Sequence, residues 1–220
     1  MPKTQLYKDV FKDVMSFIRR YVVTNVSLSQ IFSNERDFQM NLAMYLAPPI
    51  HGYNNIHLEY PVVLSVYSNY AYVDIVVERG GEYVPIELKF HLRQRIHNMI
   101  FGSTVSNPFI VQRGAYDNSC YDFWKDVKRL QDMTTQYSSS VKGGLAVFLT
   151  DDKNYWTPKS PSINYYQFRL DSNNTNQQRF WNKPSPAKSR PNFCLNPNFT
   201  PTWFPSSPKG GSAAFIVEVV

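Results

Sequence analysis

Two carboxylates and a lysine occur in a part of the sequence that is otherwise rich in apolar residues. Asp74 interrupts the run 73–77, VDIVV, and a lone carboxylate buried in such a strand costs several kcal/mol unless it is paired, hydrogen-bonded or bound to a metal. Thirteen residues later, Glu87 and Lys89 flank Leu88, and because side chains alternate along a strand they share one face. Such groups are suited to a hard cation such as Mg²⁺, which prefers oxygen ligands.

The elements that must position these groups are two strands joined by a tight turn. Residues 70–78 (YAYVDIVVE) and 82–90 (EYVPIELKF) are separated by Gly80 and Gly81, a pattern that indicates an antiparallel hairpin. In this hairpin Asp74 is expected on the same face as the acid and the lysine of the next strand. The alternative is that Asp74 lies on the solvated face of an edge strand and has no chemical role.

The remaining pattern predicts an α/β fold with a central mixed β-sheet flanked by helices. Apolar residues recur at helical spacing in some segments, and apolar runs of strand length occur in others. Helices are predicted at 5–22, 33–46 (capped by Ser33 or Asn34 and stopped before Pro48), 91–101 and 121–133. Further strands are predicted at 57–66, 145–151, 163–170 and 213–220.

A chain of 220 residues is long enough for one domain with a sizeable core. We divide it into an N-terminal helical segment (1–32), a core (33–170) and an irregular segment rich in Asn, Pro and Ser that ends in a strand (171–220). Basic and aromatic residues are mixed in the irregular segment, which indicates either a surface loop or a segment that binds single strands by stacking.

The order of a helix with Glu35, a strand with Asp74 and a strand with the Glu-Leu-Lys triplet at 87–89 resembles the PD-(D/E)XK phosphodiesterase superfamily. The resemblance implies a restriction-endonuclease-like fold. It covers roughly residues 33–151, and the triplet is its most specific part. The sequence departs from the pattern at one position, because Val73 and not proline precedes Asp74.

The resemblance also implies a role for each residue of the motif. Asp74 and Glu87 would be ligands of one or two divalent ions, Mg²⁺ or Mn²⁺, and the backbone carbonyl of Leu88 would be a further ligand. Lys89 would orient or activate the attacking water and stabilise developing charge. Glu35 would support the site, either directly or through a metal-bound water.

Three residues are predicted to bind the substrate. Gln39 lies one helical turn after Glu35 on the same face. Arg93 and Arg95 follow the catalytic strand, where their side chains could contact a phosphate backbone. A solvated loop or helix face is the alternative for the two arginines.

A charged stripe lies on the helix predicted at 121–133. Asp122, Asp126 and Arg129 fall at positions i, i+4 and i+7, beside the apolar face. The stripe either supports the site or a partner surface, or it is a solvated face stabilised by salt bridges.

The composition favours a polyanionic partner. The formal net charge is +6, and Lys and Arg neutralise phosphates. The resemblance to the phosphodiesterase superfamily, most of whose enzymes cut DNA, implies DNA ahead of RNA. Cys120 and Cys194 are far apart with no CxxC spacing, so neither a zinc site nor a disulfide framework is expected. No apolar stretch is long enough to span a bilayer, and a cytoplasmic protein without a membrane partner is expected. A second copy of the chain is a candidate partner.

Three functions stay open. The favoured one is a metal-dependent endonuclease that hydrolyses phosphodiester bonds of DNA, by analogy in restriction or defence. The second is a catalytically inactive module of the same fold that binds nucleic acid or a protein partner. The third is a structural domain in which the motif is accidental, and it predicts that Asp74 and Glu87 are too far apart to share one ion.

Overall fold

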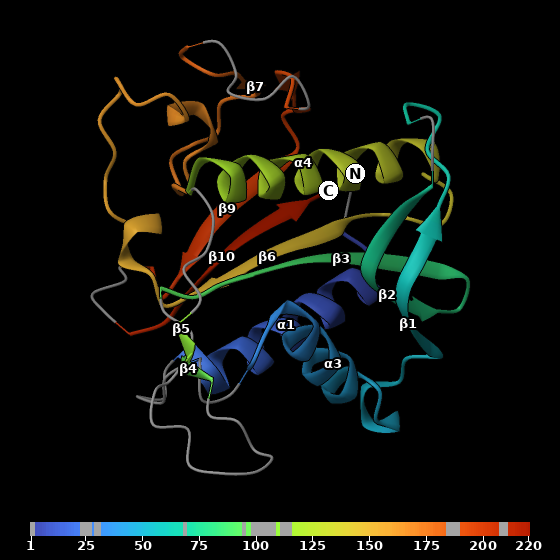
Figure 1. Ribbon diagram of the computed structural model, residues 1–220. Coiled ribbons are helices and arrows are strands. Elements are labelled where there is room, and N and C mark those ends of the chain that lie inside the picture. Colours follow the sequence, from blue (N-terminus) through green and yellow to red (C-terminus); the bar gives the residue numbers. More distant parts are fainter. Residues whose placement is uncertain are drawn as a thin grey trace.

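A six-stranded mixed β-sheet forms the centre of the molecule (Figure 1). The computed structural model describes residues 3–22, 28, 32–67, 70–93, 96–97, 109–110, 116–183, 190–206 and 211–220. The strand order is β1-β2-β3-β6-β10-β9, with β3 and β6 parallel and the other four pairings antiparallel. The predicted α/β class with a central mixed sheet is confirmed. The strands are β1 (Asn55–Val62), β2 (Ala71–Arg79), β3 (Glu82–His91), β6 (Gly144–Thr150), β9 (Phe199–Phe204) and β10 (Ala213–Val219).

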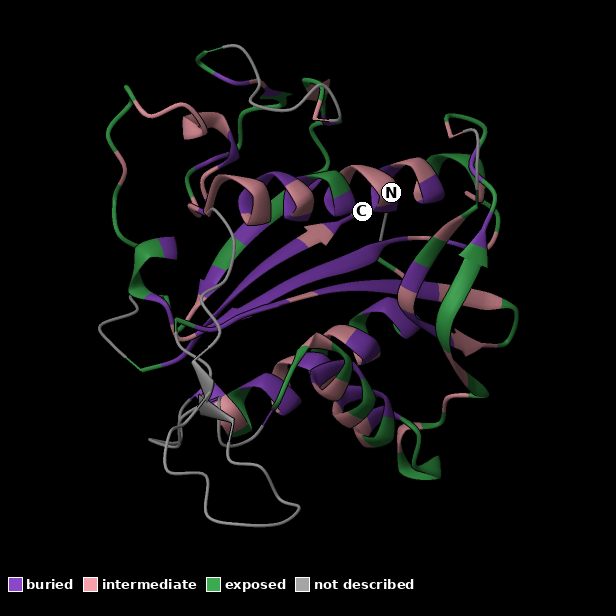
Figure 2. Cartoon of the chain, viewed as in Figure 1, coloured by how far each residue is buried: buried purple, intermediate pink, exposed green. Residues whose placement is uncertain are grey.

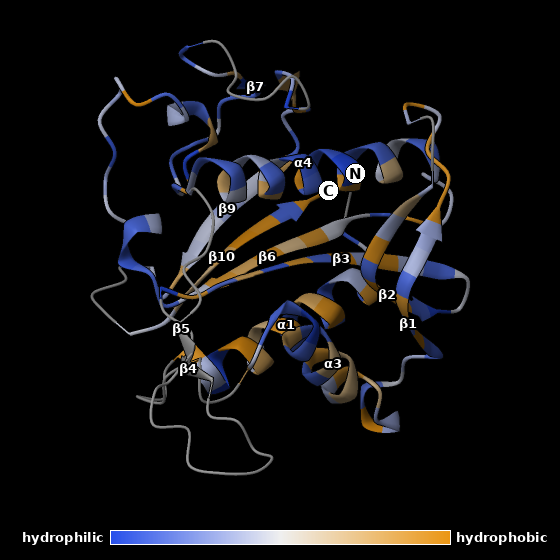
Figure 3. Cartoon of the chain, in the orientation of Figure 1, coloured by the Kyte–Doolittle hydropathy of each residue, from blue (hydrophilic) through white to orange (hydrophobic). Residues whose placement is uncertain are grey.

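Helices cover both faces of this sheet. α1 (Gln5–Val22) and α3 (Glu35–Leu46) pack on one face, and α4 (Tyr116–Gln136) packs on the other (Figure 1). Each layer has its own apolar core, one between the sheet and α1 and α3, and one between the sheet and α4. The central strands are buried (Figure 2), and β6 and β10 are apolar along most of their length (Figure 3).

The N-terminus of α3 is set by a reciprocal capping interaction. Asn34 is the N-cap, and its Oδ1 accepts a hydrogen bond from Asp37 N at 2.8 Å. Asp37 Oδ2 in turn accepts one from Ser33 N at 2.8 Å, so a free amide of the first helical turn is paired and the residue before the cap is held to that turn. The predicted start and end of this helix are confirmed. As a result Glu35 lies in the first turn, beside the sheet.

The hairpin of β2 and β3 is also confirmed. Gly80 and Gly81 have φ values of +61° and +80°, the left-handed conformation that a two-residue hairpin turn requires and that glycine adopts without strain. The two strands pair antiparallel from Arg79↔Glu82 to Ile75↔Ile86.

The strand predicted at 163–170 is wrong. This segment makes turns and the 3₁₀ helix η3 (Tyr166–Phe168). Phe168 and Leu170 are buried in the core on the α4 side, and the carbonyl of Phe168 accepts a hydrogen bond from Trp124 Nε1 at 2.9 Å. The alternating pattern therefore reflects burial against a helix and not pairing in a sheet.

The prediction of a helix at 91–101 is wrong for the residues of this segment that the structure describes. His91 is the last residue of β3, and β4 (Ile96–His97) pairs with β5 (Phe109–Ile110). Residues 94–95 and 98–101 lie outside the described residues.

The segment 171–212 contains more regular structure than predicted. β7 (Gln178–Arg179) pairs with β8 (Phe193–Cys194), and β9 pairs with β10 at the edge of the main sheet. Pro201 lies within β9, and an edge strand tolerates proline because one side of its backbone needs no ladder hydrogen bond. Within the described residues, no helix is long and apolar enough to cross a membrane.

Candidate active site

The central sheet forks at Asp74. The register of β2 and β3 ends at Ile75↔Ile86, although both strands continue beyond it. β2 continues alongside β1 as far as Val62↔Ala71, whereas β3 continues alongside β6 as far as His91↔Thr150. The backbone groups of the two strands at the fork therefore need partners other than each other.

Carboxylates satisfy two amides at the open edge of β3. Asp74 Oδ2 accepts a hydrogen bond from Leu88 N at 2.6 Å, and Glu35 Oε2 accepts one from Phe90 N at 2.9 Å. On the other side of the fork, Gln39 Nε2 donates to the backbone carbonyl of Asp74 at 2.6 Å. The fork is thus held open by side chains of β2 and α3.

The fork places Asp74 next to Glu87. Asp74 Oδ2 binds the amide of Leu88, the residue that follows Glu87 in β3, and the charge of Asp74 acts on the buried Glu87 carboxylate. Leu88 and Phe90 pack into the core formed with α1 and α3, so by alternation Glu87 and Lys89 face α4.

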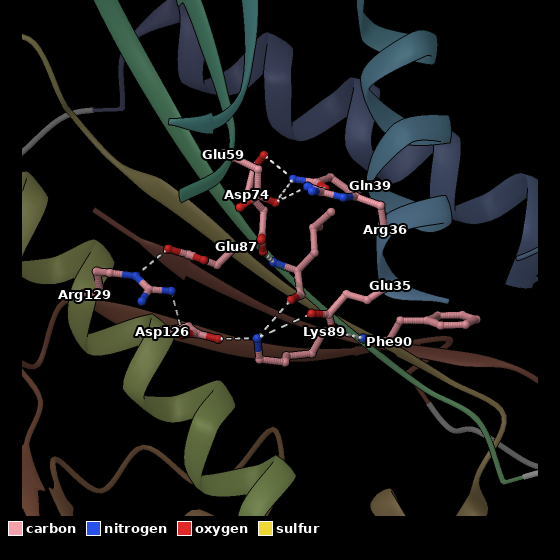
Figure 4. A network of polar contacts seen from close by, with 11 residues as sticks. Glu35, Arg36, Gln39, Glu59, Asp74, Glu87, Lys89, Phe90, Asp126 and Arg129 are labelled. Atoms are coloured by element: carbon pink, nitrogen blue, oxygen red, sulfur yellow. Dashed lines mark hydrogen bonds and ion pairs between the residues drawn. The ribbon is translucent and has the colours of Figure 1, made fainter. Parts of the chain in front are cut away.

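α4 completes the site with two charged residues (Figure 4). Arg129 Nε donates to Glu87 Oε1 at 2.7 Å, and Arg129 Nη2 donates to Asp126 Oδ1 at 2.7 Å. Asp126 Oδ2 lies 3.0 Å from Lys89 Nζ, which is 3.8 Å from Glu35 Oε1. Acidic and basic groups therefore alternate across the site from α4 to α3.

Burial and neighbouring charges change the pKa values of the carboxylates. Burial raises the pKa of Asp74 to about 6, although the Leu88 amide and the Lys89 ammonium act in the opposite direction. Burial also raises the pKa of Glu87 well above its ordinary value; the charge of Asp126 adds to this effect and Arg129 opposes it. Both acids thus lack enough positive charge around them to favour ionisation.

The pKa of Lys89 is also raised, and for a lysine this favours the charged form. Burial alone would lower its pKa, but the carboxylates of Asp126, Glu35 and Asp74 raise it above the ordinary value. Lys89 is therefore an ammonium ion at neutral pH, where it can donate hydrogen bonds and stabilise negative charge but cannot accept a proton.

Glu59 of β1 is a neighbour that the sequence did not single out. It lies between Leu58↔Ile75 and Tyr60↔Val73 in the register, opposite Asp74. Its φ of +49° is rare for a residue with a side chain. Its carboxylate accepts hydrogen bonds from Arg36 at 2.6 Å and from Gln39 Nε2 at 3.0 Å. No local pattern identifies this residue, because only the β1–β2 register places it beside Asp74.

The predicted substrate-binding residues lie in different surroundings. Gln39 is only 2 % exposed, and its Nε2 is bound to the Asp74 carbonyl and to Glu59; these contacts make it a positioning residue for β2. Arg93 is exposed just beyond β3, and its backbone N–H donates to Asp151 Oδ1 at 2.7 Å. Arg95 lies outside the described residues.

The three charged residues predicted to form a stripe on α4 do not all contact the site. Asp126 and Arg129 contact the site, whereas Asp122 Oδ1 lies 3.7 Å from Arg190 Nε in the irregular segment. Two of the three residues thus support the candidate site.

The donor groups that face the fork suit a hard cation. Across the described residues, no three His, Cys, Asp or Glu side chains form a group that could hold a metal ion by themselves. The candidate ligands are Asp74, Glu87 and the carbonyl of Leu88. Mg²⁺ typically takes one or two carboxylates and keeps several waters, so this set fits the ion. Burial raises the pKa of both acids, and a bound cation would lower it again.

Comparison with known proteins gives no match: no family model, no curated protein and no solved structure is significantly similar to this chain.

Proposed function

We propose that this chain is a divalent-metal-dependent nuclease of the restriction-endonuclease-like fold that hydrolyses phosphodiester bonds of DNA. The observation that supports the proposal is the fork in the sheet, where Asp74 binds the amide that follows Glu87 and the charged Lys89 lies 3.0 Å from Asp126. A structural domain with an accidental motif would have no need to gather three buried or half-buried charges there.

Each group of the site has a task in phosphodiester hydrolysis. Asp74, Glu87 and the Leu88 carbonyl would hold Mg²⁺ or Mn²⁺, which supplies Lewis-acid stabilisation and a lower pKa of bound water. Lys89 donates hydrogen bonds to the attacking water and to the phosphate oxygens, and its charge offsets the charge that develops there. Glu35 supports the lysine, since Glu35 Oε1 lies 3.8 Å from Lys89 Nζ.

The charge of the chain supports a nucleic acid as the substrate. The formal net charge is +6, which raises the association rate and the affinity for a polyanion at low salt. Arg93, exposed at the end of β3, is placed to contact the backbone of such a substrate.

A nuclease assay with matched variants tests this proposal. Plasmid, linear duplex and single-stranded DNA and RNA are incubated with Mg²⁺ or Mn²⁺ and with Glu87→Gln, Lys89→Ala or Glu82→Gln. We expect metal-dependent cleavage that the first two substitutions reduce at least about 100-fold and that Glu82→Gln, at the other end of β3, leaves intact. Cleavage that persists in Glu87→Gln and Lys89→Ala would contradict the assignment.

The contacts of α4 favour a second candidate function. Glu87 is bound to Arg129 and Lys89 to Asp126, an arrangement that also suits an inactive module of the same fold that binds nucleic acid. Binding of DNA without cleavage, in a protein that does bind Mn²⁺, would identify this second function.

A further inference from the structure

Arg129 places a fixed positive charge inside the candidate active site. Its Nε donates to Glu87 Oε1 and its Nη2 donates to Asp126 Oδ1, each at 2.7 Å. Glu87 is only 2 % exposed, so this guanidinium is the counter-ion of a buried carboxylate. One oxygen of a candidate metal ligand is thus already paired with a cation that belongs to the chain.

The charges of the site leave room for one divalent ion. Ion binding requires the carboxylates to be ionised, and in that state two cations, Lys89 and Arg129, face four carboxylates, which leaves two negative charges unbalanced. One divalent ion balances them, whereas a second would leave an excess of positive charge in a half-buried site, where charge imbalance is costly. The four carboxylates are those of Glu35, Asp74, Glu87 and Asp126.

We infer that Arg129 acts as a built-in second cation, so that the site binds a single divalent ion on the Asp74 side. In two-metal nucleases a pair of ions clamps the attacking and leaving oxygens of the phosphate; here the guanidinium stands at the second position. This inference rests on the proposed function.

The geometry of Arg129 supports contact with the substrate. Nε and Nη2 bind carboxylates, while Nη1 makes no hydrogen bond within the described part of the chain, and the side chain is 21 % exposed. A guanidinium held in this way offers its remaining N–H groups to a phosphate oxygen in a fixed orientation. In the inferred arrangement Arg129 restrains Glu87 and has Nη1 available for an oxygen of the scissile phosphate.

The number of bound ions tests the inference without reference to cleavage. Mn²⁺ binding to the full chain is measured at pH 7.5 by titration calorimetry and by electron paramagnetic resonance of the free ion. The proteins are wild type, Arg129→Gln, Arg129→Lys and, as a matched control, Arg79→Gln, whose arginine pairs with Asp9 at the far end of the hairpin.

We expect one ion per wild-type chain and per Arg129→Lys and Arg79→Gln chain. Arg129→Gln should bind a second ion or bind the first at least about tenfold more tightly, because a positive charge close to the ion is removed. Two ions on the wild type overturn the inference and leave the proposed function standing. Weaker or unchanged binding by Arg129→Gln also overturns it, because that result marks a purely structural arginine.

Two further outcomes are distinguishable. If Arg129→Gln fails to fold in a thermal melt, the wild-type and Arg129→Lys stoichiometries decide, with one ion on each supporting the inference and two on either overturning it. No binding by the wild type would overturn the proposed function together with the inference.

Discussion

Replacement of Asp74 by asparagine should stabilise the metal-free protein at neutral pH. Asp74 Oδ2 accepts a hydrogen bond from Leu88 N at 2.6 Å, and the side-chain oxygen of asparagine can accept the same bond. The backbone carbonyl keeps its hydrogen bond from Gln39. The substitution therefore removes the negative charge and changes little else.

The magnitude follows from the pKa of the carboxyl group. Burial raises the pKa of Asp74 from an ordinary 3.8 to about 6, which at ~1.4 kcal/mol per pKa unit amounts to about 3 kcal/mol. The folded protein holds this proton more tightly than the unfolded chain does. The resulting stability is fully present below about pH 4 and is lost as the pH rises through about 6.

An asparagine side chain cannot ionise, so the Asp74→Asn variant avoids this loss. The two proteins should be equally stable below about pH 4, and the variant should be more stable by about 3 kcal/mol at pH 7, or about 6–12 °C in Tm. Urea unfolding with EDTA at a series of pH values from about 4 to about 7 measures the difference. Asp171→Asn, at a half-exposed aspartate of the irregular segment, controls for the altered net charge.

If the difference in unfolding free energy between the two proteins does not change with pH, or if the Asp74→Asn protein is the less stable one at pH 7, this account of the site is refuted. Addition of Mn²⁺ gives a second comparison. The ion should raise the Tm of the wild type, because it binds the folded state alone, and should leave the variant unchanged. An equal response of both proteins would exclude Asp74 as a ligand.

Three further changes test the framework of the site and of the fold. Gln39→Ala removes the donor at 2.6 Å from the Asp74 carbonyl and should cost about 1–3 kcal/mol in urea unfolding; unchanged stability would mean that water replaces the amide. Lys89→Met should reduce cleavage at least about 100-fold while Mn²⁺ binding persists, and full activity would remove the lysine from the mechanism. Gly143→Ala places a Cβ 2.8 Å from the Val219 carbonyl oxygen and should lower stability by about 1–3 kcal/mol; an unchanged Tm would show that the strands can shift.

The elements that could be predicted from the sequence are those with local causes. Asn34 caps α3 through a residue three positions away, and two adjacent glycines supply the turn between β2 and β3. Strand alternation placed Glu87 and Lys89 on the face opposite Leu88, as observed. The same kind of pattern misled at 163–170, because a period of two does not say whether a segment packs on a strand or on a helix.

The α/β class, the hairpin and the charged residues near its end follow from patterns within single segments of the sequence. Three features appear only in the folded chain. The β2–β3 ladder ends at Ile75 and does not reach Asp74, Glu59 lies opposite this aspartate, and Arg129 of α4 pairs with Glu87. The physical reason is that each of these features joins residues more than a dozen positions apart. Their contacts depend on where distant strands and helices pack, and no pattern within one segment records that.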